Sequence, residues 1–302
     1  MATFKEEKLR RLTFAEINDM EAEVDNLIIN TQTQLHGEII KHYNNPDYFY
    51  AVIPLILGSF MVSYRSILYT HNYQITQYTI NHINDTFGVL LSYNGLLEEH
   101  TALLRTQNNT LDKFNMSFFS RKSFKDGKSI DQRIKTIISG AEKTVRNIAE
   151  VGVKNGLSAE DIAKQIDNFI RPDKRRVWKS PIEWVKERFA NPSVKQLQIR
   201  GGSLDYNAIR IARTEGMNTL RDSYYQQLKG KPWIQGWNWI LSARHKGTGC
   251  LCEYFTNGSP YTDKEIDNLK SHPNCMCRIE PIINMTYMGG LELSPELKGV
   301  LL

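Results

Sequence analysis

All four cysteines of this 302-residue chain lie close together near its C-terminal end. They fall within 28 consecutive residues, from Cys250 to Cys277, and the 249 residues before them contain none. A secreted protein stabilised by disulfides distributes its cysteines through the fold, whereas clustered cysteines in a reducing compartment more often bind metal. Residues 1–14 also lack the apolar run and cleavage site of a secretory signal. We therefore expect the chain to reside in the cytoplasm of the cell that makes it.

Two histidines accompany the cysteines and extend the set of candidate metal ligands to six. The set is His245, Cys250, Cys252, His272, Cys275 and Cys277. A tetrahedral zinc site needs four thiolate or imidazole ligands, and calcium and magnesium prefer oxygen instead. The pattern predicts a structural zinc. Three alternatives stay open: reduced thiols held by packing, a disulfide between the two C-x-C turns, and a catalytic zinc with Glu253 as the general base.

The first half of the chain has the periodicity of long helices. Thr13 and Glu16 have the spacing of a capping box and predict a helix start, and Asn44-Asn45-Pro46 predicts the end of that helix. Tyr48 to Tyr64 then gives 17 residues without a charge, interrupted by Pro54. This length is at the lower limit for crossing a bilayer. We expect a buried core helix; the alternative is a segment that contacts a membrane only after a conformational change.

Two further helices are predicted before residue 171. Apolar residues from Ile134 to Ala149 recur at helical spacing, and Asn155-Gly156 predicts the end of that helix. Ser158 is the expected N-cap of the next helix, with Asp161 near its positive end. Arg171-Pro172 closes it.

Beyond residue 202 the pattern combines helix with strand. Residues 205–228 predict a helix, the segment holding Trp237 and Trp239 predicts a strand, and residues 277–283 predict a second strand. The fold class is therefore α+β and mostly α. The predicted domains are a helical domain (1–170), a basic linker containing Pro and Gly (171–202), a small Cys/His-containing α+β module (203–285) and a C-terminal tail (286–302).

One segment carries the whole basic excess of the chain. Residues 171–200 hold nine Lys/Arg and three acids, a balance of +6, whereas the total net charge is +5, so the remainder sums to −1. Basic segments with interleaved aromatic residues are typical of non-specific contact with DNA phosphates. A solvated surface or a protein-docking face is the alternative. The candidate DNA-binding residues are Lys174, Arg175, Arg176, Trp178, Lys179, Trp184, Lys186 and Arg188.

Familiar catalytic motifs are missing from the sequence. It contains no G-x-S-x-G, no P-loop and no G-x-G-x-x-G. Arg213, Thr214 and Glu215 lie in the middle of a predicted helix, where spacing alone favours a solvated face with local charge pairs. The sequence gives no reason to expect an enzyme beyond the catalytic-zinc alternative.

The order of these motifs resembles the phage Mu protein F-like, or head morphogenesis, family of minor head proteins of tailed bacteriophages. The resemblance covers 205–282, about a quarter of the chain. Met276 replaces the arginine usual in the family's HPNCRC ending, and the upstream pair is C-x-C where many members have C-x2-C. The matching residues are Ala212-Arg213-Thr214-Glu215, Trp239, Leu241-Ser242-Ala243-Arg244-His245, Cys250, Cys252, His272-Pro273-Asn274-Cys275-Met276-Cys277 and Pro281.

The resemblance implies a structural virion protein and not an enzyme. Such a protein lies in the capsid interior or at the portal vertex, after assembly in the host cytoplasm, and acts in capsid assembly and in DNA packaging, retention or ejection. The implied partners are the portal protein and double-stranded DNA, with the scaffolding and major capsid proteins as further candidates.

Within the module, the resemblance implies structural roles for its motif residues. We expect Arg213 or Glu215 to be buried and paired with the HPNC turn, which we define as His272–Cys275. The full set of structural motif residues is Arg213, Thr214, Glu215, Trp239, Arg244, Pro273 and Asn274.

Two other functions remain as alternatives. One is a metal-dependent nuclease or toxin-like enzyme that uses His245, Glu253 and His272. The other is a zinc-ribbon-like nucleic-acid-binding regulator.

Overall fold

A computed structural model describes residues 4–122, 126–172, 203–242, 251–284 and 287. The described residues are mostly helical and contain a two-stranded sheet near the C-terminal end, which confirms the predicted α+β, mostly α fold class. Contacts divide the chain into two compact units. Unit 1 comprises residues 1–19, 69–130 and 211–302, and unit 2 comprises residues 20–68 and 131–210.

Each unit is therefore built from segments that are distant in sequence, which differs from the predicted linear division into domains at residues 170, 202 and 285. Long helices explain the difference, because α1 (Phe4–His42), α2 (Pro46–Ile83) and α8 (Leu204–Leu228) each contribute residues to both units. The Pro/Gly-containing linker at 171–202 lies, from residue 173, outside the described residues.

The predicted start of the first helix is wrong. Helix α1 begins at Phe4, so Thr13 and Glu16 lie inside it. Residues 5–12 consist almost entirely of Lys, Glu, Leu and Arg, which favour helix and give the chain no reason to break before Thr13. Glu16 does not cap; it accepts hydrogen bonds from His71 at 2.6 Å and from Tyr78 at 3.1 Å.

Three local signals are confirmed. Pro46 begins α2, at the position where a missing N–H is tolerated. Gly156 ends α5 (Ile130–Lys154) with a φ of +68°, which glycine adopts without strain. Ser158 caps α6 (Ala159–Ile170) by accepting from the backbone N–H of Asp161 at 3.1 Å. Local turn chemistry therefore fixes most helix boundaries in unit 2.

Helices α1 and α2 bury side chains at the same spacing within unit 2. The intervals between successive buried positions are four, four, three, four and four residues in both helices. This pattern repeats every 11 residues, or about 3.67 per turn, and so stays close to the 3.6 of a straight α-helix. The buried positions are Met20, Val24, Ile28, Thr31, Leu35 and Ile39 in α1, and Phe49, Ile53, Leu57, Phe60, Tyr64 and Leu68 in α2.

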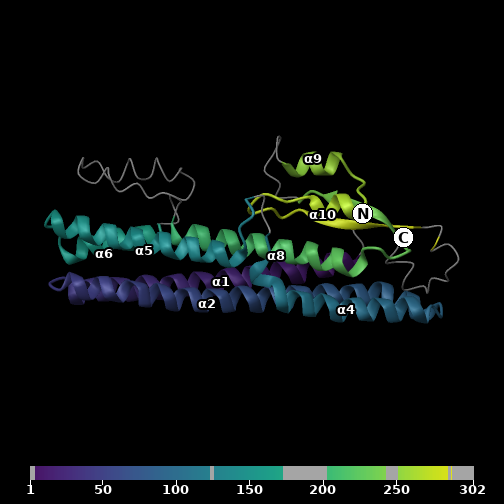
Figure 1. Ribbon diagram of the computed structural model, residues 1–302, viewed down its shortest axis with the longest axis horizontal. Coiled ribbons are helices and arrows are strands. Elements are labelled where there is room, and N and C mark those ends of the chain that lie inside the picture. Colours follow the sequence, from purple (N-terminus) through teal and green to yellow (C-terminus); the bar gives the residue numbers. More distant parts are fainter. Residues whose placement is uncertain (1–3, 123–125, 173–202, 243–250, 285–286, 288–302) are drawn as a thin grey trace. The chain divides into compact units, whose positions relative to one another are not determined.

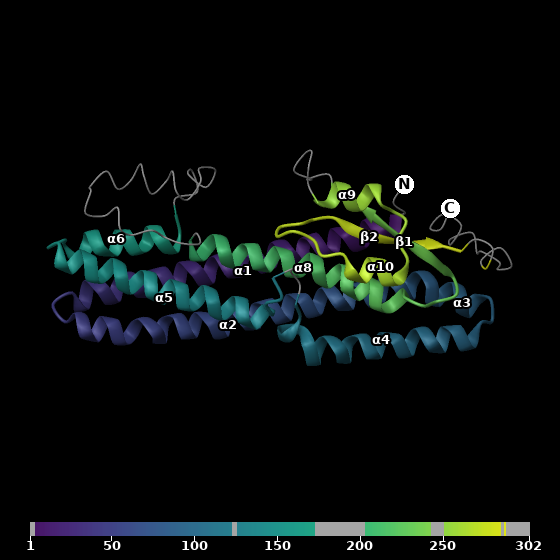
Figure 2. The same ribbon diagram turned by 45° about the horizontal axis from the view of Figure 1, so that its top comes forward.

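Polar contacts join the helices of unit 2 beyond this apolar core (Figure 2). The Tyr43 hydroxyl donates to the carbonyl of Leu157 at 2.6 Å, and Tyr64 donates to the carbonyl of Ala208 at 2.7 Å. The Arg171 guanidinium lies 2.7 Å from the Asp25 carboxylate. Arg171 is the one cation of the basic segment that the structure describes, and it is paired within unit 2.

In unit 1, helix α8 lies between other helices and the sheet layer, as both ribbon views show (Figure 1). On the helical side are the end of α2, the π-turn η1 (Asn84–Gly88), α3 (Val89–Tyr93), α4 (Leu97–Ser117) and the short turn η2 (Phe118–Ser120). On the other side are β1 (Ile234–Ile240), α9 (Leu251–Asn257), α10 (Asp263–Asn268) and β2 (Arg278–Ile283). Both predicted strands and the predicted helix at 205–228 are confirmed; α9 and α10 were not predicted.

The apolar block at Tyr48–Tyr64 forms part of α2, which continues through Pro54. Among the described residues, the helical stretch Pro46–Tyr93 is long and apolar enough to cross a membrane, with a mean hydropathy of 1.6 over its best window. A third of that window is buried. Length and composition alone do not separate a membrane span from a core helix, and the buried stripe of α2 fits the expected core helix.

Candidate metal centre and its surroundings

The sheet supports the cysteine region from behind. Strands β1 and β2 pair antiparallel, with Trp239 opposite Ile279. Trp237 and Trp239 are both buried, and the Trp237 indole N–H donates to Asp263 at 2.6 Å. Gly236 is required here because a Cβ would lie 2.9 Å from the carbonyl oxygen of Tyr261. The strand thus forms a fixed base from which the HPNC turn and Cys277 lead into β2.

The HPNC turn is held by main-chain geometry and by helix α8. Cys275 N donates to the carbonyl of His272 at 3.2 Å, and Asn274 has a φ of +59°, which Asn tolerates better than most residues. Across 60 residues of sequence, the Asn274 N–H donates to Thr214 Oγ1 at 2.9 Å. Thr214 is completely buried. The motif helix and the HPNC turn are therefore parts of one packed structure.

Three candidate ligands meet beside this turn. The ligand atoms of Cys252, His272 and Cys275, which we call the Cys/His cluster, all lie within 4.8 Å of one another. The two sulfur atoms are 3.3 Å apart, and both cysteines are buried as free thiols. Because Pro273 O can only accept, His272 Nδ1 donates to it at 2.8 Å, which directs the lone pair to Nε2. Two thiols and an oriented imidazole fit a soft or borderline metal ion such as zinc.

Cys277 lies next to this cluster. It is buried and free, and its Sγ is within hydrogen-bonding reach of both Cys252 and Cys275. The backbone N–H of Ser242 donates to Cys277 Sγ at 3.4 Å. The thiol of Cys252 donates to Cys275, and this hydrogen bond lowers the pKa of Cys275 and raises that of Cys252. The cluster is therefore arranged to hold negative charge.

A buried arginine of α8 adjoins the thiols. Arg221 donates to the carbonyl of Cys277 at 2.5 Å and to Ser271 Oγ at 2.9 Å, and it also bonds Asn218. Its guanidinium lies over the ring of Trp239, 5.5 Å from the ring centroid, and 3.9 Å from Cys275 Sγ. Arg221 thus connects α8 to the sheet and to both ends of the cysteine turn.

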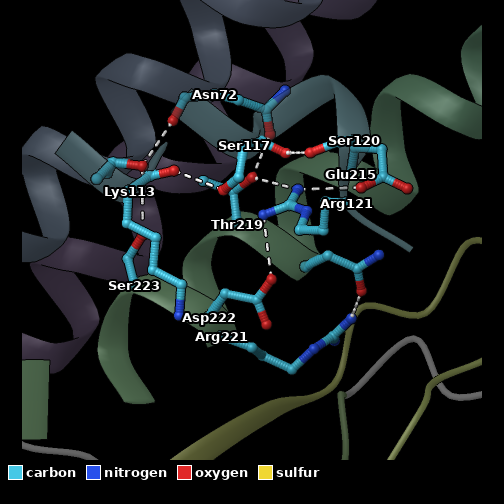
Figure 3. Close-up of polar contacts among 12 residues, drawn as sticks. Asn72, Lys113, Ser117, Ser120, Arg121, Glu215, Thr219, Arg221, Asp222 and Ser223 are labelled. Atoms are coloured by element: carbon cyan, nitrogen blue, oxygen red, sulfur yellow. Dashed lines mark hydrogen bonds and ion pairs between the residues drawn. The ribbon is translucent and has the colours of Figure 1, made fainter. Parts of the chain in front are cut away.

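A second buried arginine contact lies on the opposite side of α8 (Figure 3). Arg121, just after η2, donates to Glu215 at 3.0 Å, to Thr219 at 2.9 Å and to Asp222 at 3.1 Å. Thr219 in turn donates to Asn72 of α2 at 2.6 Å. Glu215 is fully buried. These bonds attach the loop after α4, and α2, to the same helix that bears the motif.

The structure brings together some predicted residues and not others. Glu215 is buried as expected, but the contact that defines its position is Arg121, and Thr214 is the motif residue that bonds the HPNC turn. Arg213 is exposed. Trp239 and Pro273 lie beside the cluster, on β1 and in the HPNC turn. The candidates Arg244, His245 and Cys250 lie outside the described residues, as do all eight candidate DNA-binding residues.

Sequence reasoning missed Arg121 and Arg221. Arg221 had a detectable signal, because Thr214, Asn218 and Arg221 follow at positions i, i+4 and i+7 and so share one helix face. Arg121 had none, since its partners are about 100 residues away and its own neighbourhood resembles an ordinary loop.

No protein-family model, no curated protein and no solved structure shows a significant match to this chain.

Proposed function

We propose that this chain is a minor head protein of a tailed bacteriophage that binds the portal and acts in head assembly and in DNA packaging, retention or ejection. The observation that carries the proposal is the hydrogen bond from Asn274 N–H to Thr214 Oγ1 beside the Cys/His cluster. Residues matched to the head morphogenesis family at two distant positions are thereby parts of one structural unit. The buried partners of this unit are structural in kind, which supports a virion component over an enzyme.

We propose zinc as the metal that the module binds. Two buried thiols and an imidazole whose Nδ1 is fixed by a backbone carbonyl suit zinc, and the oxygen ligands that calcium and magnesium require are not part of the cluster. When bound, zinc would cross-link α9, the HPNC turn and, through Thr214, helix α8. Such a metal stabilises a small module whose own hydrophobic core is limited.

The DNA-binding part of the proposal rests on charge. The basic segment follows α6 directly, and its first cation, Arg171, is paired with Asp25. The eight Lys/Arg after Arg171 supply the positive charge for phosphate contact. We propose that this segment contacts packaged or exiting double-stranded DNA without sequence preference.

Co-expression with the portal protein encoded in the same genome tests the proposal. We expect the full chain to co-elute with assembled portal rings in size-exclusion chromatography and to survive a wash at moderate salt. Portal rings from an unrelated phage are the matched control. Elution of the two proteins as separate species, with a folded zinc-loaded chain, would refute the portal association.

A further inference from the structure

Arg221 is a buried cation whose described partners are almost all neutral. Only 7% of its surface is exposed. Its guanidinium bonds a carbonyl, an amide and a hydroxyl, and lies over an indole ring, and within the described part of the chain no carboxylate pairs with it. Burying a charge without an opposite charge is unfavourable by several kcal/mol. The nearest group that can become an anion is Cys275 Sγ, at 3.9 Å.

Charge balance then determines how many thiolates the metal centre needs. A zinc ion with two thiolates and a neutral imidazole has no net charge, and it would leave Arg221 uncompensated. A third thiolate gives the centre a charge of −1, which matches the single positive charge of Arg221. The thiol available is Cys277, which is 2% exposed and lies within hydrogen-bonding reach of both cluster cysteines.

The surroundings of Cys277 fit a ligand. The Ser242 N–H donates to its sulfur at 3.4 Å, and an N–H directed at a metal-bound sulfur is a common outer contact of thiolate sites. Its carbonyl accepts from Arg221 at 2.5 Å, which holds the residue that follows the HPNC turn in place. Both contacts fix the backbone on either side of the thiol.

We infer that Cys277 is the fourth ligand of the centre and that Arg221 is its compensating cation. This inference rests on the proposed zinc site. Cys252, His272, Cys275 and Cys277 then form a closed tetrahedral Cys₃His centre with no position for a water or substrate. Such a centre is structural. It needs neither His245 nor Cys250, and it gives the enzyme alternative no open coordination site.

X-ray absorption spectroscopy at the zinc edge, on the purified full chain, counts the ligands directly. We expect three sulfur atoms at about 2.3 Å and one nitrogen at about 2.0 Å. The Cys250→Ser variant should give the same spectrum. Two sulfurs with two lighter atoms, or four sulfurs, would overturn the inference while leaving zinc binding intact. Protein that contains no zinc would instead overturn the proposed zinc site.

The role of Arg221 needs a separate measurement, by zinc competition with a chromophoric chelator. Arg221→Met keeps the bulk and removes the charge, and we expect zinc affinity to fall by about 10- to 100-fold, as for other residues that support metal ligands. Arg221→Lys should recover part of the loss. Arg213→Met, an exposed arginine on the same helix, is the control and should bind as wild type. Equal affinity in Arg221→Met and wild type would overturn the compensating role, and the spectroscopy decides the ligand set even if this variant does not fold.

Discussion

Arg121 reaches across from the end of η2 to place its guanidinium 3.0 Å from the buried carboxylate of Glu215, 94 residues later in the sequence. The same guanidinium also holds Asp222, whose side chain is half exposed. One arginine therefore makes a buried and an exposed ion pair with the same helix, and the two pairs can be compared directly.

Removing the buried pair should destabilise the protein far more than removing the exposed one. In Glu215→Gln the Arg121 guanidinium loses its buried counter-charge, and we expect the free energy of unfolding to fall by about 3 kcal/mol. In Asp222→Asn the loss should stay below about 1 kcal/mol, because solvent screens that pair. Urea unfolding followed by circular dichroism measures both. Similar losses in the two variants would contradict the structural role assigned to Glu215.

The hydrogen bond between Thr214 and the HPNC turn gives a second stability test. Thr214→Val keeps the shape but leaves the Asn274 N–H without its acceptor, and we expect a loss of about 1–3 kcal/mol. Thr214→Ser retains the oxygen and should lose much less. Thermal melting of both variants, with zinc present throughout, checks the difference. If valine and serine behaved alike, the hydroxyl would not be what holds the turn.

Metal removal should unfold the module rather than merely empty it. We expect elemental analysis to find about one zinc per chain, and a strong chelator to lower the melting temperature, because metal binding at such sites is coupled to folding. Readdition of zinc should restore the original melting curve. Metal-free protein with an unchanged melting curve would point to packed thiols, and mass spectrometry after alkylation would then test for a disulfide.

Binding to DNA should depend steeply on salt. The logarithm of the association constant should fall with the logarithm of salt concentration, by about 0.9 for each phosphate neutralised on duplex DNA. Changing Arg175 and Arg176 to Ala should reduce this slope by about one to two units. Arg171→Ala is the matched control, because Arg171 is already paired with Asp25 and should leave the slope unchanged. Equal slopes in wild type and the double variant would make the segment a protein-docking face.

Tyr225 predicts a pH dependence on the alkaline side. Burial, with smaller contributions from Asp267 and Asp263, raises its pKa from 10.0 to about 12. Because the folded pKa lies above the unfolded one, this stabilisation is complete below pH 10 and is lost as the pH rises through about 12. Tyr225→Phe should therefore flatten the decline of unfolding free energy between these pH values. A variant that declines as steeply as wild type would show that other groups cause it.

The sequence predicted features that depend on neighbouring residues. Pro46, Gly156 and Ser158 mark helix boundaries because each acts within one turn of its own position. The same reasoning failed at Thr13, where a capping pattern lies inside a longer run of helix-favouring residues. A short pattern cannot show that the helix has already begun.

The centre could be predicted only as a set of residue types. Which thiols meet depends on α9 and on the strand register, and the partners of Glu215 and Arg221 come from segments 50 to 100 residues away. No local pattern encodes such pairings. The shared face of Thr214, Asn218 and Arg221 is the exception, because a helix fixes it in advance.

The equal burial spacing of α1 and α2 has a consequence for how this protein can vary in length. Because the buried positions of both helices return after 11 residues, removing one such repeat from each would bring the next buried side chain into the vacated position on both sides of the hairpin. Unit 2 can thus shorten or lengthen in steps of about 16 Å along these helices while keeping its core in register. A seven-residue step would instead rotate the buried stripe out of register, so length variants of this unit should differ by multiples of 11.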